Sequence, residues 1–277
     1  MYREWGPVEN ADEIQRDILE PAGRLLSSQP SLLRLSGRTL VIGDLHGDLE
    51  ATRTALELFG KGGHEHMLFL GDYVDRGRQS VPLLELIVEA MLADPGRVHM
   101  LRGNHETLWV NDEHGFRDEL VERKLGGLHL PFNDMFSQLP AAAVIGGTIL
   151  ACHGGVPEEV PSLEDLKAIR KGVVEPHEST DRLMLGLLWN DPKESLKGFA
   201  PNTYRGYMKV FGWQAFDDFL KKNELKGIVR GHQRWPEGYR YFFDGRLLSV
   251  FSCASYSPNV KRKAVTVDNA AFSILDL

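Results

Sequence analysis

The sequence predicts an α/β fold with a parallel sheet. Three short apolar runs, Thr39–Ile42, Met67–Leu70 and Val98–Leu101, have the length of buried strands. Between them lie two segments with helical spacing of apolar residues, Leu49–Phe59 and Val81–Leu92. A β-α-β-α-β alternation of this kind produces parallel strands joined by right-handed crossovers.

The remaining segments are less regular. Residues 11–34 have a helix-compatible composition that Pro21 interrupts, and residues 162–226 predict helix mixed with loop. The chain is strand-rich from Ile228 onward, and Asp244-Gly245 is a hairpin signal there. The further predicted strands are Thr148–Cys152, Tyr239–Phe243, Leu247–Phe251 and Ala264–Val267. Because no linker or repeat divides the chain, we expect residues 1–277 to form a single catalytic domain without a separate regulatory domain.

Composition narrows the functional classes. The net charge of -7 argues against a general nucleic-acid partner, which needs a basic surface. Two cysteines are too few for a disulfide framework. The most apolar stretch, Ala141–Cys152, is shorter than the roughly 20 residues that span a bilayer. With no apolar signal segment near Met1, we expect a cytoplasmic protein without a membrane partner.

Five short motifs carry the side chains that suggest chemistry. Three of them directly follow the predicted parallel strands, whose carboxyl ends meet at one edge of the sheet. Carboxylate, imidazole and amide-oxygen ligands together suit small divalent transition ions. The motifs are Gly43-Asp44-Leu45-His46-Gly47, Gly71-Asp72-Tyr73-Val74-Asp75-Arg76-Gly77, Gly103-Asn104-His105-Glu106, His153-Gly154-Gly155 and Arg230-Gly231-His232.

One further segment, His64-Glu65-His66, has the residue types of a metal pair. The Gly62-Gly63 turn in front of it favours a solvated loop instead.

In this order, the five motifs resemble those of the PPP family of serine/threonine protein phosphatases, members of the calcineurin-like metallophosphoesterases. The resemblance includes Leu187-Leu188-Trp189-Asn190-Asp191-Pro192, and Arg205-Gly206 followed by Phe211-Gly212. It implies a central β-sandwich of two mixed sheets flanked by helices, the calcineurin-like metallophosphoesterase fold.

The resemblance also implies a role for each motif residue. It implies two divalent ions, for which manganese is the first choice and iron or zinc are alternatives. It also makes His105 the acid that protonates the leaving alkoxide, with Asp75 orienting the His105 ring. The phosphate would be held by Arg76, Arg102 and Arg205, with Asn104 and Tyr256 beside it. The implied ligands are Asp44, His46 and Asp72 for the first ion and Asp72, Asn104, His153 and His232 for the second.

These residues predict metal-dependent hydrolysis of phosphoserine and phosphothreonine in phosphoprotein substrates, by direct attack of a metal-bridging hydroxide. Two cations about 3.5–4 Å apart would neutralise the phosphate oxygens and lower the pKa of a bound water toward about 7. Regulatory proteins are not specified by the sequence. One alternative is a dinucleoside polyphosphate hydrolase of the same superfamily, which shares the first three motifs. An alternative of another class is a catalytically silent phosphoprotein-binding scaffold.

Overall fold

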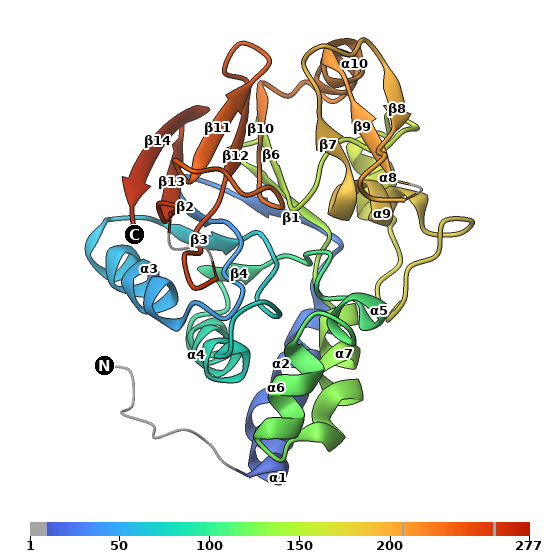
Figure 1. Ribbon diagram of the computed structural model, residues 1–277. Helices are drawn as coiled ribbons and strands as arrows, with labels where there is room; N and C mark the ends of the chain where they lie inside the picture. The colour runs from blue at the N-terminus through green and yellow to red at the C-terminus, as the bar shows by residue number, and fades with distance from the viewer. Residues whose placement is uncertain (1–9, 207, 257–258) are drawn as a thin grey trace.

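The computed structural model describes residues 10–206, 208–256 and 259–277, and its strands form two large mixed sheets (Figure 1). Strands β2, β3 and β4 are parallel, and β13 joins them antiparallel to β2. The five-stranded sheet has the order β14 (Ala271–Asp276), β13 (Lys263–Asp268), β2 (Thr39–Ile42), β3 (His66–Phe69) and β4 (Val98–Met100). The predicted parallel β-α-β-α-β unit is confirmed.

The second sheet contains six strands. Its central strands β6, β10 and β12 are parallel, while β5 and β11 are antiparallel to their neighbours β6 and β12. The order is β1 (Leu32–Leu35), β5 (Ala142–Ile145), β6 (Ile149–Cys152), β10 (Gly227–Arg230), β12 (Leu247–Val250) and β11 (Tyr239–Phe242). The hairpin signal at Asp244-Gly245 is confirmed, since both residues have positive φ in the turn between β11 and β12.

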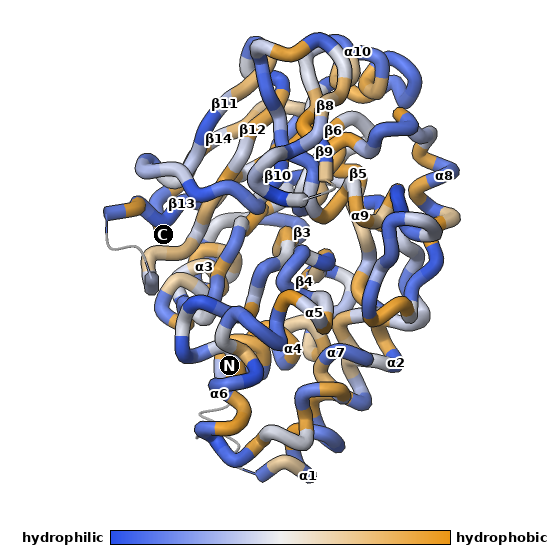
Figure 2. Tube along the Cα trace, turned by 45° about the vertical axis from the view of Figure 1, so that its right-hand side comes forward, coloured by the Kyte–Doolittle hydropathy of each residue, from blue (hydrophilic) through white to orange (hydrophobic). Residues whose placement is uncertain are grey.

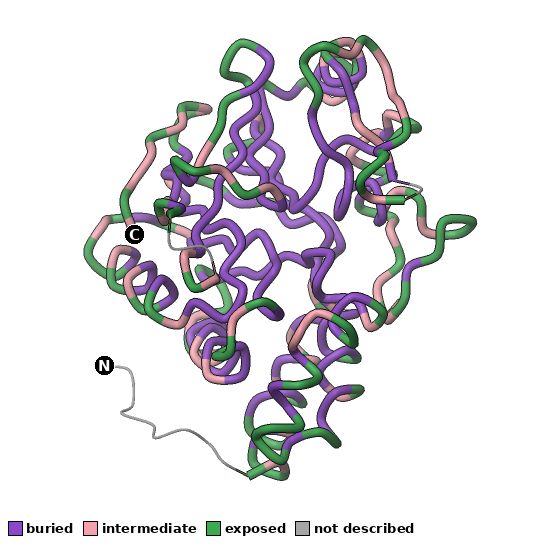
Figure 3. The backbone as a smooth tube through the Cα atoms, in the orientation of Figure 1, coloured by how far each residue is buried: buried purple, intermediate pink, exposed green. Residues whose placement is uncertain are grey.

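Side chains alternate between two cores, as the period of a strand requires. On β2, Val41 faces the other large sheet, whereas Leu40 and Ile42 face helices. Figure 3 shows the buried chain concentrated in the central strands, and Figure 2 shows helices that carry both hydrophilic and hydrophobic residues. The predicted sandwich of two mixed sheets flanked by helices is confirmed.

Helices cover both outer faces. The five-stranded sheet packs against one group: α1 (Ala11–Glu13), η1 (Ile14–Leu19), α2 (Glu20–Ser28), α3 (Leu49–Lys61), α4 (Ser80–Ala93), α6 (Phe116–Glu122), η2 (Gly126–Leu128) and α7 (His129–Ser137). The six-stranded sheet is covered by α8 (Leu163–Lys167), α9 (Arg182–Trp189) and α10 (Trp213–Lys222). The short helix α5 spans Leu108–Asn111. Among the described residues, no helix has the length and apolar character needed to cross a bilayer.

Two regions differ from the expectation. The first helical segment continues past Pro21, because Pro21 lies in the first turn of α2, where its missing N–H is tolerated. The turn before it is a π-helix, and the segment ends at Ser28, so that Leu32–Leu35 forms a strand. Within residues 162–226, a small sheet forms from β7 (Asp191–Pro192), β9 (Lys209–Phe211) and β8 (Phe199–Pro201). Strands this short lack a periodic signal in the sequence.

Candidate metal centre

The site lies in the loops that follow the strands, and these loops have unusual backbone conformations. His46, Asp72, Asp75, Arg76 and His232 all have φ between 42° and 71°. Non-glycine residues rarely adopt this left-handed region, which costs of order 1–3 kcal/mol per residue unless the surroundings enforce it. Five of the twelve described non-glycine residues with positive φ thus lie in these motifs, which indicates that the surroundings hold the loops in place.

The buried carboxylate of Glu106 holds two of these loops together. It accepts hydrogen bonds from the backbone N–H groups of Asp72 at 2.7 Å, Tyr73 at 2.9 Å and Gly103 at 3.0 Å. Burial, followed by the charge of Asp72, raises the pKa of Glu106 to about 7. The Glu106 side chain therefore fixes the loop after β3 against the loop after β4. Glu106 belongs to one of the five motifs, but the sequence alone does not predict this bracing role.

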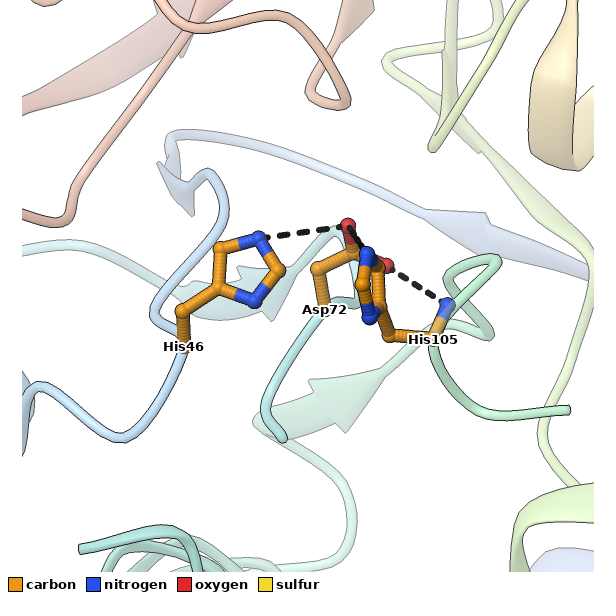
Figure 4. Close-up of side chains that lie close together, drawn as sticks. All are labelled: His46, Asp72 and His105. Carbon is orange, nitrogen blue, oxygen red and sulfur yellow. Dashed lines mark hydrogen bonds and ion pairs between the residues drawn. The ribbon is translucent and has the colours of Figure 1, made fainter. Parts of the chain in front are cut away.

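Asp72 lies at the centre of the site (Figure 4). Its Oδ2 is 3.6 Å from Nε2 of His46 and 3.9 Å from Nε2 of His105, and its Oδ1 is 3.2 Å from Nε2 of His153. Burial alone would raise the pKa of Asp72, but His153 and His105 hold it well below its ordinary value. The two oxygens of one carboxylate thus face two different groups of nitrogen ligands.

The second group contains Asp72, His153 and His232, whose ligand atoms lie within 4.8 Å of one another. Nε2 of His153 is 2.9 Å from Oδ1 of Asn104 and 3.1 Å from Nδ1 of His232. The other ring nitrogen of His153 is 3.1 Å from the carbonyl oxygen of Leu70, which orients the ring. Imidazole, carboxylate and amide oxygen converging in a buried position form a donor set that fits a divalent transition ion.

The first group is His46, Asp72 and His105, in which His105 takes the place expected for Asp44. Asp44 lines the same cavity, and its Oδ1 accepts a hydrogen bond from the backbone N–H of His232 at 2.7 Å. Burial and the nearby Asp72 raise the pKa of Asp44 to about 6. Two carboxylates buried close together favour a cation between them. Asp44 therefore fits a ligand role beside this group.

His105 and Asp75 form a tight pair. Nδ1 of His105 is 2.5 Å from Oδ2 of Asp75, whose other oxygen accepts a hydrogen bond from the backbone N–H of Phe116 at 2.9 Å. Burial alone would lower the pKa of His105, but Asp72 and the hydrogen bond with Asp75 raise it. A histidine kept protonated and oriented in this way can donate a proton from Nε2.

A cavity of about 200 Å³ brings most of these residues together. Its lining includes two of the three expected arginines, Arg76 and Arg205, together with Tyr256, whose ring packs edge-on against His46. Nε of Arg205 donates to Oδ2 of Asp191 at 2.7 Å. The full lining is Asp44, His46, Asp72, Arg76, Asn104, His105, Arg205, His232, Arg234, Phe251 and Tyr256.

Arg102 is a correction to the sequence expectation. Its side chain is completely buried and does not line the cavity. The guanidinium instead donates to three backbone carbonyl oxygens, those of Glu106, Val173 and Val174, at 2.7–3.0 Å. Its position next to Gly103 suggested a phosphate contact, but the side chain is enclosed in the protein interior by these carbonyl acceptors. Arg102 therefore braces the loop that carries Asn104 and His105.

Two residues near the cavity had no role in the sequence interpretation. Asp191 binds Arg205 through Oδ2 and Arg230 through Oδ1, the latter at 3.1 Å. Asp191 belongs to the segment Trp189–Pro192 that the resemblance includes, but the sequence does not predict which arginines it binds. Arg234 also lines the cavity. It lies two residues after His232, outside the motif Arg230-Gly231-His232.

Comparisons with known proteins agree with this geometry. Residues 37–236 match the family model described as calcineurin-like phosphoesterase. A protein serine/threonine phosphatase from Saccharomyces cerevisiae with similarity to human phosphatase PP5 is 28% identical, with a TM-score of 0.86, over 96% of this chain and 89% of that chain.

A cold-active protein-tyrosine phosphatase from a psychrophilic Shewanella species shares the fold at 20% identity, with a TM-score of 0.64, over 91% of this chain and 81% of that chain. The likeness to the PPP phosphatases that the motifs suggested is confirmed by the family match and the yeast structure. The chain belongs to the calcineurin-like phosphoesterase family.

Proposed function

We propose that this protein hydrolyses phosphoserine and phosphothreonine in proteins with two divalent ions, manganese first. The observation that carries the proposal is the His105–Asp75 pair. Nε2 of His105 is 3.9 Å from Oδ2 of Asp72, the residue that both groups of metal-ligand atoms share, and His105 lines one cavity with Arg76 and Arg205. Metal ligands, a positioned acid and two guanidinium groups are the components needed to cleave an unactivated phosphate ester.

Each residue has a task in this reaction. Bound ions would neutralise phosphate charge and make a water nucleophilic at neutral pH. Asp44, His46 and Asp72 would hold one ion, and Asp72, Asn104, His153 and His232 the other. Arg76 and Arg205 would bind the phosphoryl oxygens, since planar guanidinium groups match them. Nε2 of His105 would donate a proton to the leaving serine or threonine oxygen, while Asp75 holds the ring.

The size of the cavity supports a protein substrate. About 200 Å³ accommodates a phosphoryl group, whereas sites that enclose a whole small ligand are about 300–1,000 Å³. A phosphorylated side chain can insert its phosphate while the peptide stays on the surface. The segment Trp189–Pro192 belongs to the resemblance to protein phosphatases, and its Asp191 binds Arg205, the arginine proposed to bind phosphate. The yeast relative is itself named a protein serine/threonine phosphatase.

The decisive experiment compares metal-reconstituted protein on phosphoserine, phosphothreonine and phosphotyrosine peptides and on diadenosine tetraphosphate. We expect the chelated protein to be inactive, manganese to restore activity, and serine and threonine phosphates to be the best substrates. Much faster cleavage of diadenosine tetraphosphate would replace this proposal with dinucleoside polyphosphate hydrolysis. Tight binding of phosphopeptides without turnover under any metal would instead identify a silent scaffold.

A further inference from the structure

Among the described residues, three guanidinium groups line the cavity. Arg76 and Arg205 are the pair assigned to the reacting phosphoryl group, and Arg234 is the third. The carboxylates that line the same cavity are Asp44 and Asp72, both of which belong with the metal ligands. The arginines therefore create a local positive site on a protein whose overall charge is -7.

Arg234 is carried on a turn that is anchored on both sides. Before it, His232 has a φ of 69°, and Oε1 of Gln233 accepts a hydrogen bond from Nη1 of the buried Arg230 at 3.0 Å. After it, the indole Nε1 of Trp235 donates to Oγ of Ser249 at 3.1 Å. Gln233 and Trp235 thus bind inward, while Arg234 is exposed and lines the cavity. A fixed turn lowers the entropy cost of presenting this side chain to a ligand.

The surroundings of the three arginines differ. Arg205 is held by Asp191, which also binds Arg230, so its position belongs to a buried network. Arg234 lies instead on the turn that follows His232, and it lines the cavity together with Tyr256. Tyr256 packs on His46 at 5.4 Å between ring centroids, at the rim of the ligand group. Arg205 is thus fixed by a buried network, whereas Arg234 lines the cavity from an exposed position on its turn.

We propose that Arg234 binds a second anionic group of the substrate, a carboxylate or a phosphate on a residue next to the phosphorylated one. The inference rests on the proposed protein phosphatase function and adds a preference for acidic or multiply phosphorylated segments. Arg76 and Arg205 would already bind the reacting phosphoryl group, so a third guanidinium group in the same cavity matches a separate negative group. Such a preference corresponds to a difference in binding free energy between acidic and neutral substrates in the same site.

The test uses three peptides that share one phosphoserine. The first has neutral neighbours, the second has glutamate on both sides, and the third has an adjacent second phosphoserine. We expect kcat/KM of the manganese-loaded protein to be about three- to tenfold higher for at least one acidic peptide, the range of a partly exposed charge pair. The glutamate and phosphoserine peptides distinguish a carboxylate from a phosphate as the second anion.

Arg234→Gln should abolish this preference while changing kcat/KM for the neutral peptide by less than about twofold, and Arg234→Lys should restore part of the preference. Arg53→Gln is the matched control, because Arg53 is an exposed arginine on α3 that does not line the cavity. Calorimetric binding of the same peptides to manganese-loaded His105→Asn protein should show the same ranking without turnover.

Equal kcat/KM of the wild-type protein for all three peptides would overturn the inference. An equal loss of kcat/KM on all three peptides in Arg234→Gln would also overturn it, because that result would assign Arg234 to the reacting phosphoryl group. Either result leaves the protein phosphatase proposal standing. Cleavage of diadenosine tetraphosphate without turnover of any phosphopeptide would overturn both.

Discussion

The two ends of the parallel strands β3 and β4 both contain clustered histidines, yet only one end forms a candidate metal centre. Beyond the carboxyl ends, Asp72 lies within 4 Å of His46, His105 and His153. Towards the amino ends, Nδ1 of His66 lies 3.2 Å from Nε2 of His99, and no group of metal-ligand atoms is found there among the described residues.

The difference lies in the partners of the imidazole rings. Burial and the neighbouring His66 lower the pKa of His99 to about 4, so this ring is neutral in the folded protein. Burial would also lower the pKa of His105 and His153, but Asp72 reverses the direction and raises both values. Burial still lowers the pKa of His46, which faces the same carboxylate, to about 4. The carboxyl ends are therefore distinguished by the Asp72 carboxylate shared among the imidazoles, which is absent from the His66–His99 pair.

The segment His64-Glu65-His66 is a correction that follows from this comparison. Instead of a solvated loop, His64 is buried with its Nε2 2.9 Å from Oγ1 of Thr266, and His66 begins β3.

The largest effect is expected for Asp72→Asn. This change removes charge from the side chain that faces both groups of ligand atoms, so kcat/KM should fall by more than about 10³-fold and metal content should decrease. His66→Gln at the opposite end should leave both quantities within about twofold. Steady-state kinetics and elemental analysis provide the measurements. An Asp72→Asn protein with full activity would remove Asp72 from the centre of the mechanism.

His105→Asn should lower kcat for an alkyl phosphopeptide by about 10²–10⁴-fold with KM and metal content nearly unchanged. The loss should be smaller for an aryl phosphate, whose leaving group requires less protonation. Comparing kcat on the two substrates tests the role of the proton. An equal loss on both would indicate that the substitution disturbs the ligand group containing His46 and Asp72 instead.

Asp191→Asn should have an intermediate effect, raising KM and lowering kcat/KM by about 10–100-fold, the usual size for a residue that orients a functional group. Asparagine keeps the shape of the side chain but loses the charge that holds Arg205 and Arg230. Asp217→Asn is a suitable control, because Asp217 pairs with the distant Arg246. Unchanged kinetics in Asp191→Asn would show that Arg205 does not depend on this contact.

The smallest effect concerns stability at the histidine pair. Because the pKa of His99 is depressed in the folded protein, its contribution is present above the ordinary value of about 6.5 and is lost as the pH falls toward about 4. We expect the free-energy difference between wild type and His99→Gln to shrink by about 1–3 kcal/mol between pH 7.5 and pH 4.5. Urea unfolding at both pH values measures it. A pH-independent difference would contradict the neutral, buried assignment.

Much of the fold followed from local patterns. The runs Thr39–Ile42 and Val98–Leu101 are apolar and short, so they indicate buried strands without any knowledge of their neighbours, and β2 and β4 formed there. Strand β5 was not predicted, because it lies inside the apolar stretch Ala141–Cys152. In the structure, Gly146-Gly147 forms the turn of a hairpin that divides this stretch into β5 and β6. The strands of the small sheet are too short to carry a period of their own.

The sequence alone determined which residue types gather at the edge of the sheet, because motifs that directly follow parallel strands must meet there. It could not determine side-chain direction. The direction of a side chain depends on hydrogen-bond partners that lie far away in the chain. Arg102 points into the protein, where it donates to the carbonyl oxygen of Val173. Arg234 lines the cavity because its turn is anchored by contacts to Arg230 and Ser249. Only the tertiary structure sets those contacts, since segments far apart in the chain must meet before Arg102 reaches its three carbonyl acceptors and before the turn that carries Arg234 is anchored.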